Sequence, residues 1–294
     1  MKVPHPLPYQ GSKRGLATVI LRYMPKNTPR LIEPFAGSAA LSLAALSAHK
    51  VGHVVIADND QALMGVWQAI LDTPQRLAEN YSALWHTQLG QERSFYERVR
   101  ADFNRQHQPE QLLYLLARCV KAAVRYNGQG EFNQSADHRR KGTHPNTMQK
   151  RLLEAHTLLK NRTTLLCADY RETLQLATTQ DVVYLDPPYQ GVSQKRDRRY
   201  RNALDQEAFF TALAALNQRQ IAYMLSYDGH TGGKMYGSLL PQTLDLVRFE
   251  LCAGRSSQAT LNGKQALTYE SLYLSPALQL RLQHTPFQLD LFAA

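Results

Sequence analysis

The chain has 294 residues, a formal net charge of +10 at pH 7 and a sequence pI of about 9.5. That length fits one large α/β domain carrying a second unit, and no apolar run approaches the roughly 18 to 20 residues of a membrane span. A surface this basic attracts polyanions such as nucleic acid, although charge alone does not distinguish such a protein from a basic protein without that partner.

The N-terminal segment MKVPHPLPYQGSK has no apolar stretch after a basic start, which predicts a cytoplasmic protein and argues against secretion. The three cysteines Cys119, Cys167 and Cys252 lie far apart in the sequence. They therefore form neither a CxxC metal pair nor a dense disulfide framework. We expect three reduced, mostly buried thiols and no bound metal.

Short β-rich runs recur along the chain, and several are nearly all apolar, as strands buried on both faces of a mostly parallel sheet are. They cover residues 30–33, 53–57, 163–167, 182–185, 221–226, 244–250 and 269–274. The alanine-rich and leucine-rich stretch 38–49 between the first two runs has helical character. Strand, helix and strand at this spacing predict a βαβ unit.

The second and third predicted strands are separated by about a hundred residues, far more than a simple crossover needs. Six apolar residues within this insert fall on one face of a predicted helix: Leu112, Leu115, Leu116, Cys119, Val120 and Ala123. The insert is therefore expected to be helical and packed. Glycines at 128 and 130 end the helix, and the polar stretch 131–145 is predicted to be an exposed basic loop or hairpin. A solvated charged loop without a partner is the alternative.

The run 182–185 leads directly into Asp186, Pro187, Pro188 and Tyr189, where a sheet of this kind binds ligands. The prolines make this exit extended and rigid. If the Asp186 carboxylate and the Pro187 carbonyl accept both N–H bonds of an exocyclic aromatic amine, its lone pair becomes free to attack a methyl sulfonium. Tyr189 offers a face for a base outside the helix. We predict these four residues to be catalytic; alone, they also fit a strand-terminating acid in a proline turn.

A cofactor site is predicted at the first two strands. The run 30–33 enters a tight turn at Gly37, and the helix that begins near Ser38 directs its partial positive end at the same place. The next strand ends at Asp58, where a ribose hydroxyl pair would lie. Upstream, Lys13 can pair with the carboxylate of S-adenosylmethionine and Tyr9 can cover its sulfonium, although a solvated N-terminal lysine is the plainer interpretation of Lys13 alone.

With these motifs in this order, the chain resembles the Dam-like adenine-N6 DNA methyltransferases, in which the cofactor motif precedes the recognition region and DPPY follows it. The matching segments cover nearly the whole chain: 9–13, 33–37, 57–58, 125–127, 130–133, 186–189 and Glu270. The resemblance implies a Rossmann-like class I methyltransferase α/β sheet of seven strands, the last antiparallel, with an inserted, mainly helical target-recognition lobe. The catalytic domain would comprise residues 1–60 and 161–294, and the recognition domain residues 61–160.

The resemblance also implies site-specific transfer of a methyl group from S-adenosylmethionine to adenine N6 in double-stranded DNA, with base flipping. Cofactor contacts would fall on Tyr9, Lys13, Asp58 and Asp186, above a floor of Phe35 and Gly37. The expected DNA contacts are Arg125, Asn127, Arg139, Arg140 and Lys141, together with the basic run Lys195, Arg196, Arg198 and Arg199. We expect a monomer, with a cognate restriction endonuclease acting on the same site as a candidate partner.

Two departures from the family pattern stand out. Ala39 occupies the place where the family commonly has a second glycine, so we expect backbone angles there that suit a β-carbon. Residues 134–147 do not follow the Dam recognition hairpin closely, so the target need not be GATC. The glycine-rich stretch 229–234 is a candidate flexible segment near the target base.

Other amine methyltransferases remain open as alternatives, acting on cytosine N4, on adenine in RNA or on a protein glutamine. The long insert and the aspartate at position 186 favour adenine in DNA over these. Cytosine C5 chemistry needs a nucleophilic thiol, usually after proline, whereas these cysteines follow Arg118, Leu166 and Leu251. A catalytically silent nucleic-acid binder is the remaining alternative, and the intact DPPY motif and Lys13 argue against it.

Overall fold

The computed structural model describes residues 3–188, 204–231, 234–236, 240–255 and 267–283. Within these residues one mixed sheet has the strand order β3-β2-β1-β4-β5-β8-β7, and a short β6 pairs with β5. The strands are β1 Thr28–Glu33, β2 Val51–Asp58, β3 Thr163–Cys167, β4 Val182–Leu185, β5 Ala222–Thr231, β6 Lys234–Tyr236, β7 Val247–Arg255 and β8 Leu267–Leu274. The seven predicted strands are confirmed; β6 was not predicted.

The pairing of the strands gives the predicted topology. Neighbours from β3 to β5 are parallel, whereas β8 runs antiparallel to both β5 and β7. The last strand is therefore the antiparallel one, as expected for a class I methyltransferase sheet. The chain order reverses direction between β1 and β4, and such a switch point opens a crevice at the carboxyl ends of the strands.

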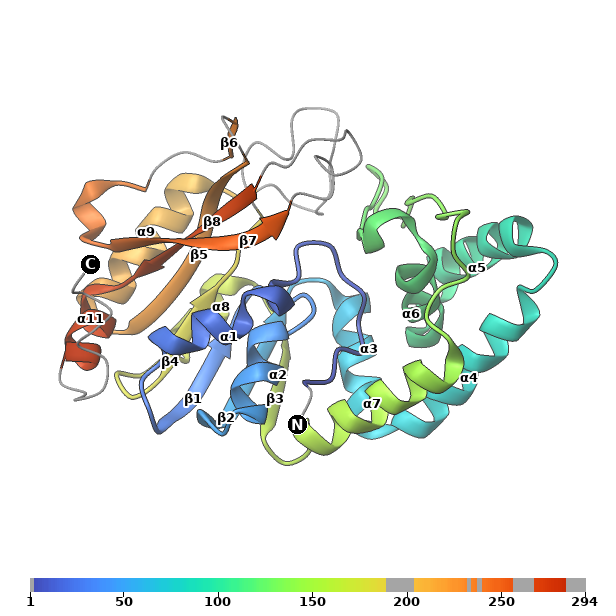
Figure 1. Ribbon diagram of the computed structural model, residues 1–294, viewed down its shortest axis with the longest axis horizontal. Helices are drawn as coiled ribbons and strands as arrows, with labels where there is room; N and C mark the ends of the chain where they lie inside the picture. The colour runs from blue at the N-terminus through green and yellow to red at the C-terminus, as the bar shows by residue number, and fades with distance from the viewer. Residues whose placement is uncertain (1–2, 189–203, 232–233, 237–239, 256–266, 284–294) are drawn as a thin grey trace.

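Helices cover both faces of the sheet (Figure 1). One face packs under α1 Ala17–Ile20, α2 Ala40–Ser47 and α11 Pro276–Gln283, and the other under α8 Tyr170–Gln175 and α9 Gln206–Gln218. Strand β4 shows why this works, because Val182 and Tyr184 enter the first core while Val183 and Leu185 enter the second. An all-apolar strand is thus buried on both faces.

The insert between β2 and β3 forms a helical lobe beside the sheet (Figure 1). Its helices are α3 Gln61–Asp72, α4 Pro74–Thr87, α5 Glu92–Gln106, α6 Pro109–Arg118 and α7 Pro145–Leu159. Helix α7 packs against α2 and α3, so buried side chains of the lobe join the core of the adjacent sheet face. The boundary of the lobe at residues 61–160 stays a prediction.

One predicted helix end was wrong. The helix expected to continue to Ala123 ends at Arg118, because Cys119 is extended (φ −76°, ψ 161°), and Lys121 and Ala122 beyond it adopt left-handed angles (φ 60° and 52°). The Val120 N–H donates instead to the Ser135 carbonyl at 2.9 Å.

The cysteine prediction holds only in part. All three thiols are free, but only Cys119 is buried, whereas Cys167 and Cys252 are exposed on strand ends and edges. In the described ranges of the chain, no helix is both long and apolar enough to cross a membrane.

Candidate active site

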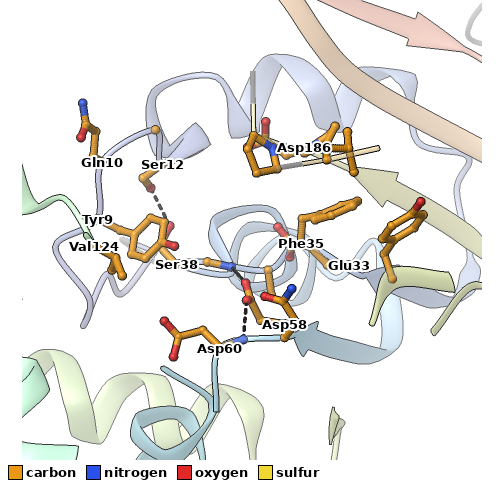
Figure 2. A pocket seen from close by; sticks show the side chains of 18 of the residues that line it. Tyr9, Gln10, Ser12, Glu33, Phe35, Ser38, Asp58, Asp60, Val124 and Asp186 are labelled. Carbon is orange, nitrogen blue, oxygen red and sulfur yellow. Dashed lines mark hydrogen bonds between the residues drawn. The ribbon is translucent and has the colours of Figure 1, made fainter. Parts of the chain in front are cut away.

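A cavity of about 270 Å³ lies at the carboxyl ends of β1, β2 and β4, at the switch point of the sheet (Figure 2). The predicted cofactor residues Tyr9, Lys13, Phe35, Gly37 and Asp58 all line it. So do the first three residues of the predicted catalytic motif, Asp186, Pro187 and Pro188. Segments far apart in the sequence therefore meet in one concave site, as the motif order suggested.

Gly37 fixes the turn at the floor of the cavity. Its φ is +48°, and a β-carbon added there would lie 2.9 Å from Cε1 of the Tyr9 ring. Its N–H donates to Oδ2 of Asp58 at 3.1 Å, and its carbonyl accepts from Nε1 of buried Trp67 at 3.0 Å. The turn is held from both sides, and the left-handed angle together with the nearby Tyr9 ring favours glycine at this position.

Ala39 differs from its expected conformation. Its φ is 47° and its ψ is 37°, in the left-handed region that glycine adopts most easily. The expectation of angles that suit a β-carbon was therefore wrong. The tight turn from Ala36, whose carbonyl accepts the Ala39 N–H, imposes the conformation on whatever residue stands there.

Asp58 is already engaged on both carboxylate oxygens. Oδ2 accepts from the Gly37 N–H, and Oδ1 accepts from the Asp60 N–H at 3.1 Å (Figure 2). Burial raises the pKa of Asp58 to about 6. Because each carboxylate oxygen has two lone pairs, Asp58 can still accept from a ligand hydroxyl while it fixes the turn.

Lys13 and Asp186 form a buried ion pair inside the cavity. The Lys13 ammonium lies 2.7 Å from Oδ1 and from Oδ2 of Asp186, and 3.5 Å from Oε2 of Glu270 on β8. The side chain of Lys13 is 6% exposed and that of Asp186 is 18% exposed. Lys13 was expected to pair with the cofactor, and its ion pair with Asp186 was not predicted.

The charges in this cluster perturb one another. Burial alone would lower the pKa of Lys13, but Asp186 and Glu270 beside it raise that pKa above its ordinary value. Burial raises the pKa of Asp186 to about 6, against the opposing influence of Lys13. Lys13 thus keeps a buried carboxylate ionised near neutral pH, as a proton acceptor must be.

A third buried acid, Glu33, lines the same cavity at the end of β1. Its Oε2 accepts from the N–H of Ser42 at 3.1 Å and from the Ser42 hydroxyl at 2.5 Å. Burial raises the pKa of Glu33 to about 7, and nearby Asp186 adds to the rise. It had been noted only as part of the family motif, so its place in the site is new.

The aromatic side of the cavity contains residues that the sequence analysis missed. Phe35 stacks on Tyr170 with ring centroids 5.1 Å apart and meets Phe209 edge to face. Asp169, which caps α8, and Arg171 also line the cavity. The signal was available, because Asp169 follows β3 as Asp58 follows β2, at the same edge of the sheet.

The helical lobe reaches the cavity through Tyr126. Its hydroxyl donates to Oδ2 of Asp60 at 2.8 Å, and Asp60 also caps α3. The neighbouring Asn127 was predicted to contact DNA, but its amide is engaged in its own turn with Glu131. Arg125, also predicted there, is half-buried.

The basic segment 137–141 of the lobe lies outside the cavity lining. Arg139 and Arg140 both pair with Asp137, and Lys141 lies 3.3 Å from Glu92. All three cations are exposed, with side-chain exposures of 78%, 50% and 56%. Five further predicted site residues, Tyr189, Lys195, Arg196, Arg198 and Arg199, lie outside the described residues, as does part of the stretch 229–234.

Comparison with known proteins assigns most of the chain to one family. Residues 9–243 match the family described as D12 class N6 adenine-specific DNA methyltransferase. The type II methyltransferase M.MjaIII of Methanocaldococcus jannaschii is 27% identical over 280 residues, which cover 86% of this chain and 95% of that protein.

Two further relatives carry related names. The retron Ec67 DNA adenine methylase of Escherichia coli is 27% identical, covering 63% of each chain. The DNA N-6-adenine-methyltransferase of Escherichia phage P1 is 30% identical over 62% of this chain but only 23% of that protein. Because the family match spans most of the chain and includes the cavity residues from Tyr9 to Ala208, the chain belongs to the D12 class N6 adenine-specific DNA methyltransferases.

Proposed function

We propose that the cavity binds S-adenosylmethionine and that the enzyme methylates adenine N6 at a specific site in double-stranded DNA. One observation carries the proposal: the rigid Asp186-Pro187-Pro188 exit and the Gly37 turn line a single cavity. A methyl acceptor at the first and a methyl donor at the second would share one enclosed space. Such proximity is a large part of catalysis for a two-substrate reaction.

The residues present fit the cofactor. S-adenosylmethionine carries a cationic sulfonium and ammonium, which the acids and the Tyr9 ring of the cavity complement. The floor at Gly37 admits a close backbone approach that a β-carbon would block. Asp58 can accept from ribose hydroxyls, and Phe35 and Tyr170 present aromatic surface beside the acceptor Asp169. The cofactor supplies an electrophilic methyl group.

The chain's own residues prepare the adenine amine. The Asp186 carboxylate and the Pro187 carbonyl accept the two N–H bonds of N6, which localises the nitrogen lone pair for attack. Lys13 holds Asp186 in place and ionised. Because N6 is paired inside a duplex, the base must leave the helix to reach the cavity, and Tyr189 is our candidate for stacking on it.

The DNA surface is proposed to run along the lobe, through Arg125, Asn127 and the basic segment, and to include the cations at 195–199. The net charge of +10 supports such a surface. We propose a monomer in the cytoplasm. The relative named as a type II methyltransferase favours a restriction-modification setting, in which an endonuclease would act on the same site.

The decisive experiment incubates the full protein and S-adenosylmethionine with mixed-sequence DNA and maps the modified atoms by modification-sensitive sequencing. N6-methyladenine in one recurring sequence is the expected result. N4-methylcytosine, or methylation of RNA alone, would overturn the substrate assignment. In parallel, calorimetry with S-adenosylmethionine, with and without DNA, tests whether the protein binds this cofactor. No binding in either case would contradict the proposal that the protein is this enzyme.

A further inference from the structure

Asp137 holds Arg139 by one edge of its guanidinium. Nε of Arg139 donates to Oδ1 at 3.0 Å, and Nη2 donates to Oδ2 at 3.1 Å. The Arg139 backbone N–H also donates to Oδ1 at 3.1 Å. The acid is 6% exposed while the arginine is 78% exposed. The guanidinium is planar, so pinning this edge fixes the direction of the adjacent one, formed by Nη1 and the second N–H of Nη2.

The platform beneath this pair is rigid. The backbone of Asp137 is held by buried Arg118, whose carbonyl accepts the Asp137 N–H at 2.8 Å and whose Nη1 donates to the Asp137 carbonyl at 3.2 Å. Four residues further on, the Lys141 carbonyl accepts from Gln88, another buried side chain, at 2.9 Å. The segment is thus tied to the lobe at both ends, independently of the Asp137 carboxylate.

Arg140 is placed differently from Arg139. Its Nε lies 3.1 Å from Oδ2 of Asp137, and its Nη2 donates to the Cys119 carbonyl at 3.2 Å. The Nε–Nη2 side of its guanidinium is therefore shared between the Asp137 carboxylate and the Cys119 carbonyl. The Arg140 side chain is 50% exposed and that of Arg139 78%, so Arg139 is the arginine that projects further from the acid.

We infer that Asp137 is a positioning residue for target recognition, presenting the Nη1–Nη2 edge of Arg139 to a guanine of the recognised sequence. This inference rests on the proposed DNA contact of the basic segment. Two parallel N–H donors in a fixed plane match the O6 and N7 acceptors of guanine in the major groove. A phosphate would be served as well by an unpaired arginine, whose charge no acid offsets. The negative charge of Asp137 weakens the attraction of Arg139 for phosphate, but its hydrogen bonds fix the direction in which the guanidinium points.

The test compares single substitutions in the full protein on the mapped target and on a panel of sites with one base pair changed. Asp137→Asn keeps the oxygen that accepts the Arg139 N–H but removes the charge and the two contacts made by Oδ2, one with each arginine. It should reduce discrimination at one G·C position by about tenfold to a hundredfold. Arg139→Ala and Arg139→Lys should reduce discrimination at the same base pair, because neither alanine nor lysine has the two parallel N–H donors of a guanidinium. Adding Asp137→Asn to Arg139→Ala should then change nothing further.

The matched control is Asp102→Asn, an exposed acid on α5 that pairs with Arg105 in the same lobe. It makes the same change in net charge, so it should leave discrimination at every position unaltered. If Arg139→Ala relaxes a position and Asp137→Asn does not, the positioning role is overturned. A loss that is equal at all sequences would make Arg139 a phosphate contact, which also overturns it. If Arg139→Ala changes neither binding nor discrimination, the proposed DNA surface itself fails at this segment.

Discussion

Two acid–cation pairs in this protein have similar distances and opposite arrangements. In the cavity, Lys13 lies 2.7 Å from Asp186, with side-chain exposures of 6% and 18%. In the lobe, Arg139 lies 3.0 Å from Asp137, with exposures of 78% and 6%. In the first pair the cation is the more buried partner and supports an acid that faces the cavity. In the second the acid is buried and supports a cation that faces solvent.

In both pairs the more exposed partner is the group that can contact a ligand. The buried partner holds that group in a fixed position. The pKa values follow the same division. Burial raises the pKa of Asp186 to about 6, whereas hydrogen bonds from Arg139 lower the pKa of Asp137 to about 2. Burial in the cavity disfavours the ionised form of Asp186, whereas the arginine next to Asp137 in the lobe favours its ionised form.

Removing the working acid of the cavity should give the largest effect. Asp186→Ala is expected to lower kcat by about 10²- to 10⁴-fold, the range that a positioned proton acceptor contributes. The affinity for DNA should stay close to that of the unaltered enzyme, because Asp186 lies inside the cavity and is proposed to contact the amine, not phosphates. Single-turnover methylation and a DNA-binding titration measure the two separately. Asp102→Ala, the same change at an exposed acid, is the control, and normal turnover by Asp186→Ala would contradict the assignment.

The parts of this site that follow strand ends could be predicted from the sequence. Asp58 ends a buried strand and Gly37 and Asp186 follow two others, and parallel strands bring their carboxyl ends to one edge. The partner of Lys13 could not be predicted in this way. Asp186 lies 173 positions away, and only the burial of both side chains makes their pairing necessary. A pattern of strands fixes where loops meet, not which charges neutralise each other.

Glu33→Gln tests how much the free energy of unfolding depends on the ionisation of a buried acid in the cavity. The pKa of Glu33 is raised from 4.5 to about 7, so the folded state binds its proton more tightly than the unfolded state. Its contribution to stability is complete below pH 4.5 and is lost as the pH rises through about 7. The loss amounts to about 3 kcal/mol for this shift. Glu33→Gln should therefore flatten the fall in unfolding free energy between pH 5 and pH 8, measured by denaturant titration.

Acids of the cavity and of the lobe should differ in this titration. Asp58 and Asp186 also have raised pKa values of about 6, so some slope remains in Glu33→Gln. Asp137 has a pKa of about 2 and is ionised in both states above pH 5, so Asp137→Asn should shift the curve without changing its slope. Equal slopes for the parent protein and Glu33→Gln would show that Glu33 is not a buried titrating acid.

The lobe illustrates what sequence periodicity misses. Apolar spacing predicted its helix through Ala123, but the helix ends at Arg118 where Cys119 bridges to Ala136. Cys119 and Ala136 are 17 positions apart in the sequence and come together only when the intervening chain folds back on itself. Periodicity describes one element at a time, so a helix end set by a bridge to a distant residue has no local signal. In contrast, both ends of the strands at 163–167 and 182–185 were predicted correctly, because residues typical of turns precede and follow each strand.

Gly37→Ala tests the close backbone approach in the cavity against a glycine of the lobe. A β-carbon at Gly37 meets the Tyr9 ring and requires a left-handed alanine, so the cofactor dissociation constant should rise about tenfold. Gly65→Ala makes the same change inside α3, where nothing lies within 4 Å of the new carbon. It should raise the unfolding free energy by about 0.5 to 1 kcal/mol and leave cofactor affinity alone. Equal cofactor affinity in the two variants, measured by calorimetry, would remove Gly37 from the binding floor.

The smallest effect is expected at Lys141, which shares the exposed segment with Arg139 but has no buried acid to direct it. Its partner Glu92 is 33% exposed, and a pair this open contributes little to stability. If Lys141 exchanges Glu92 for a phosphate on DNA, Lys141→Ala should reduce the slope of log affinity against log salt by about 0.9 and leave sequence discrimination intact. Glu92→Gln should preserve the slope, since it releases the lysine without removing it. A Lys141→Ala variant with an unchanged slope would remove Lys141 from the DNA surface and leave the contacts of this segment to its two arginines, of which Arg139 is oriented by Asp137 before DNA binds.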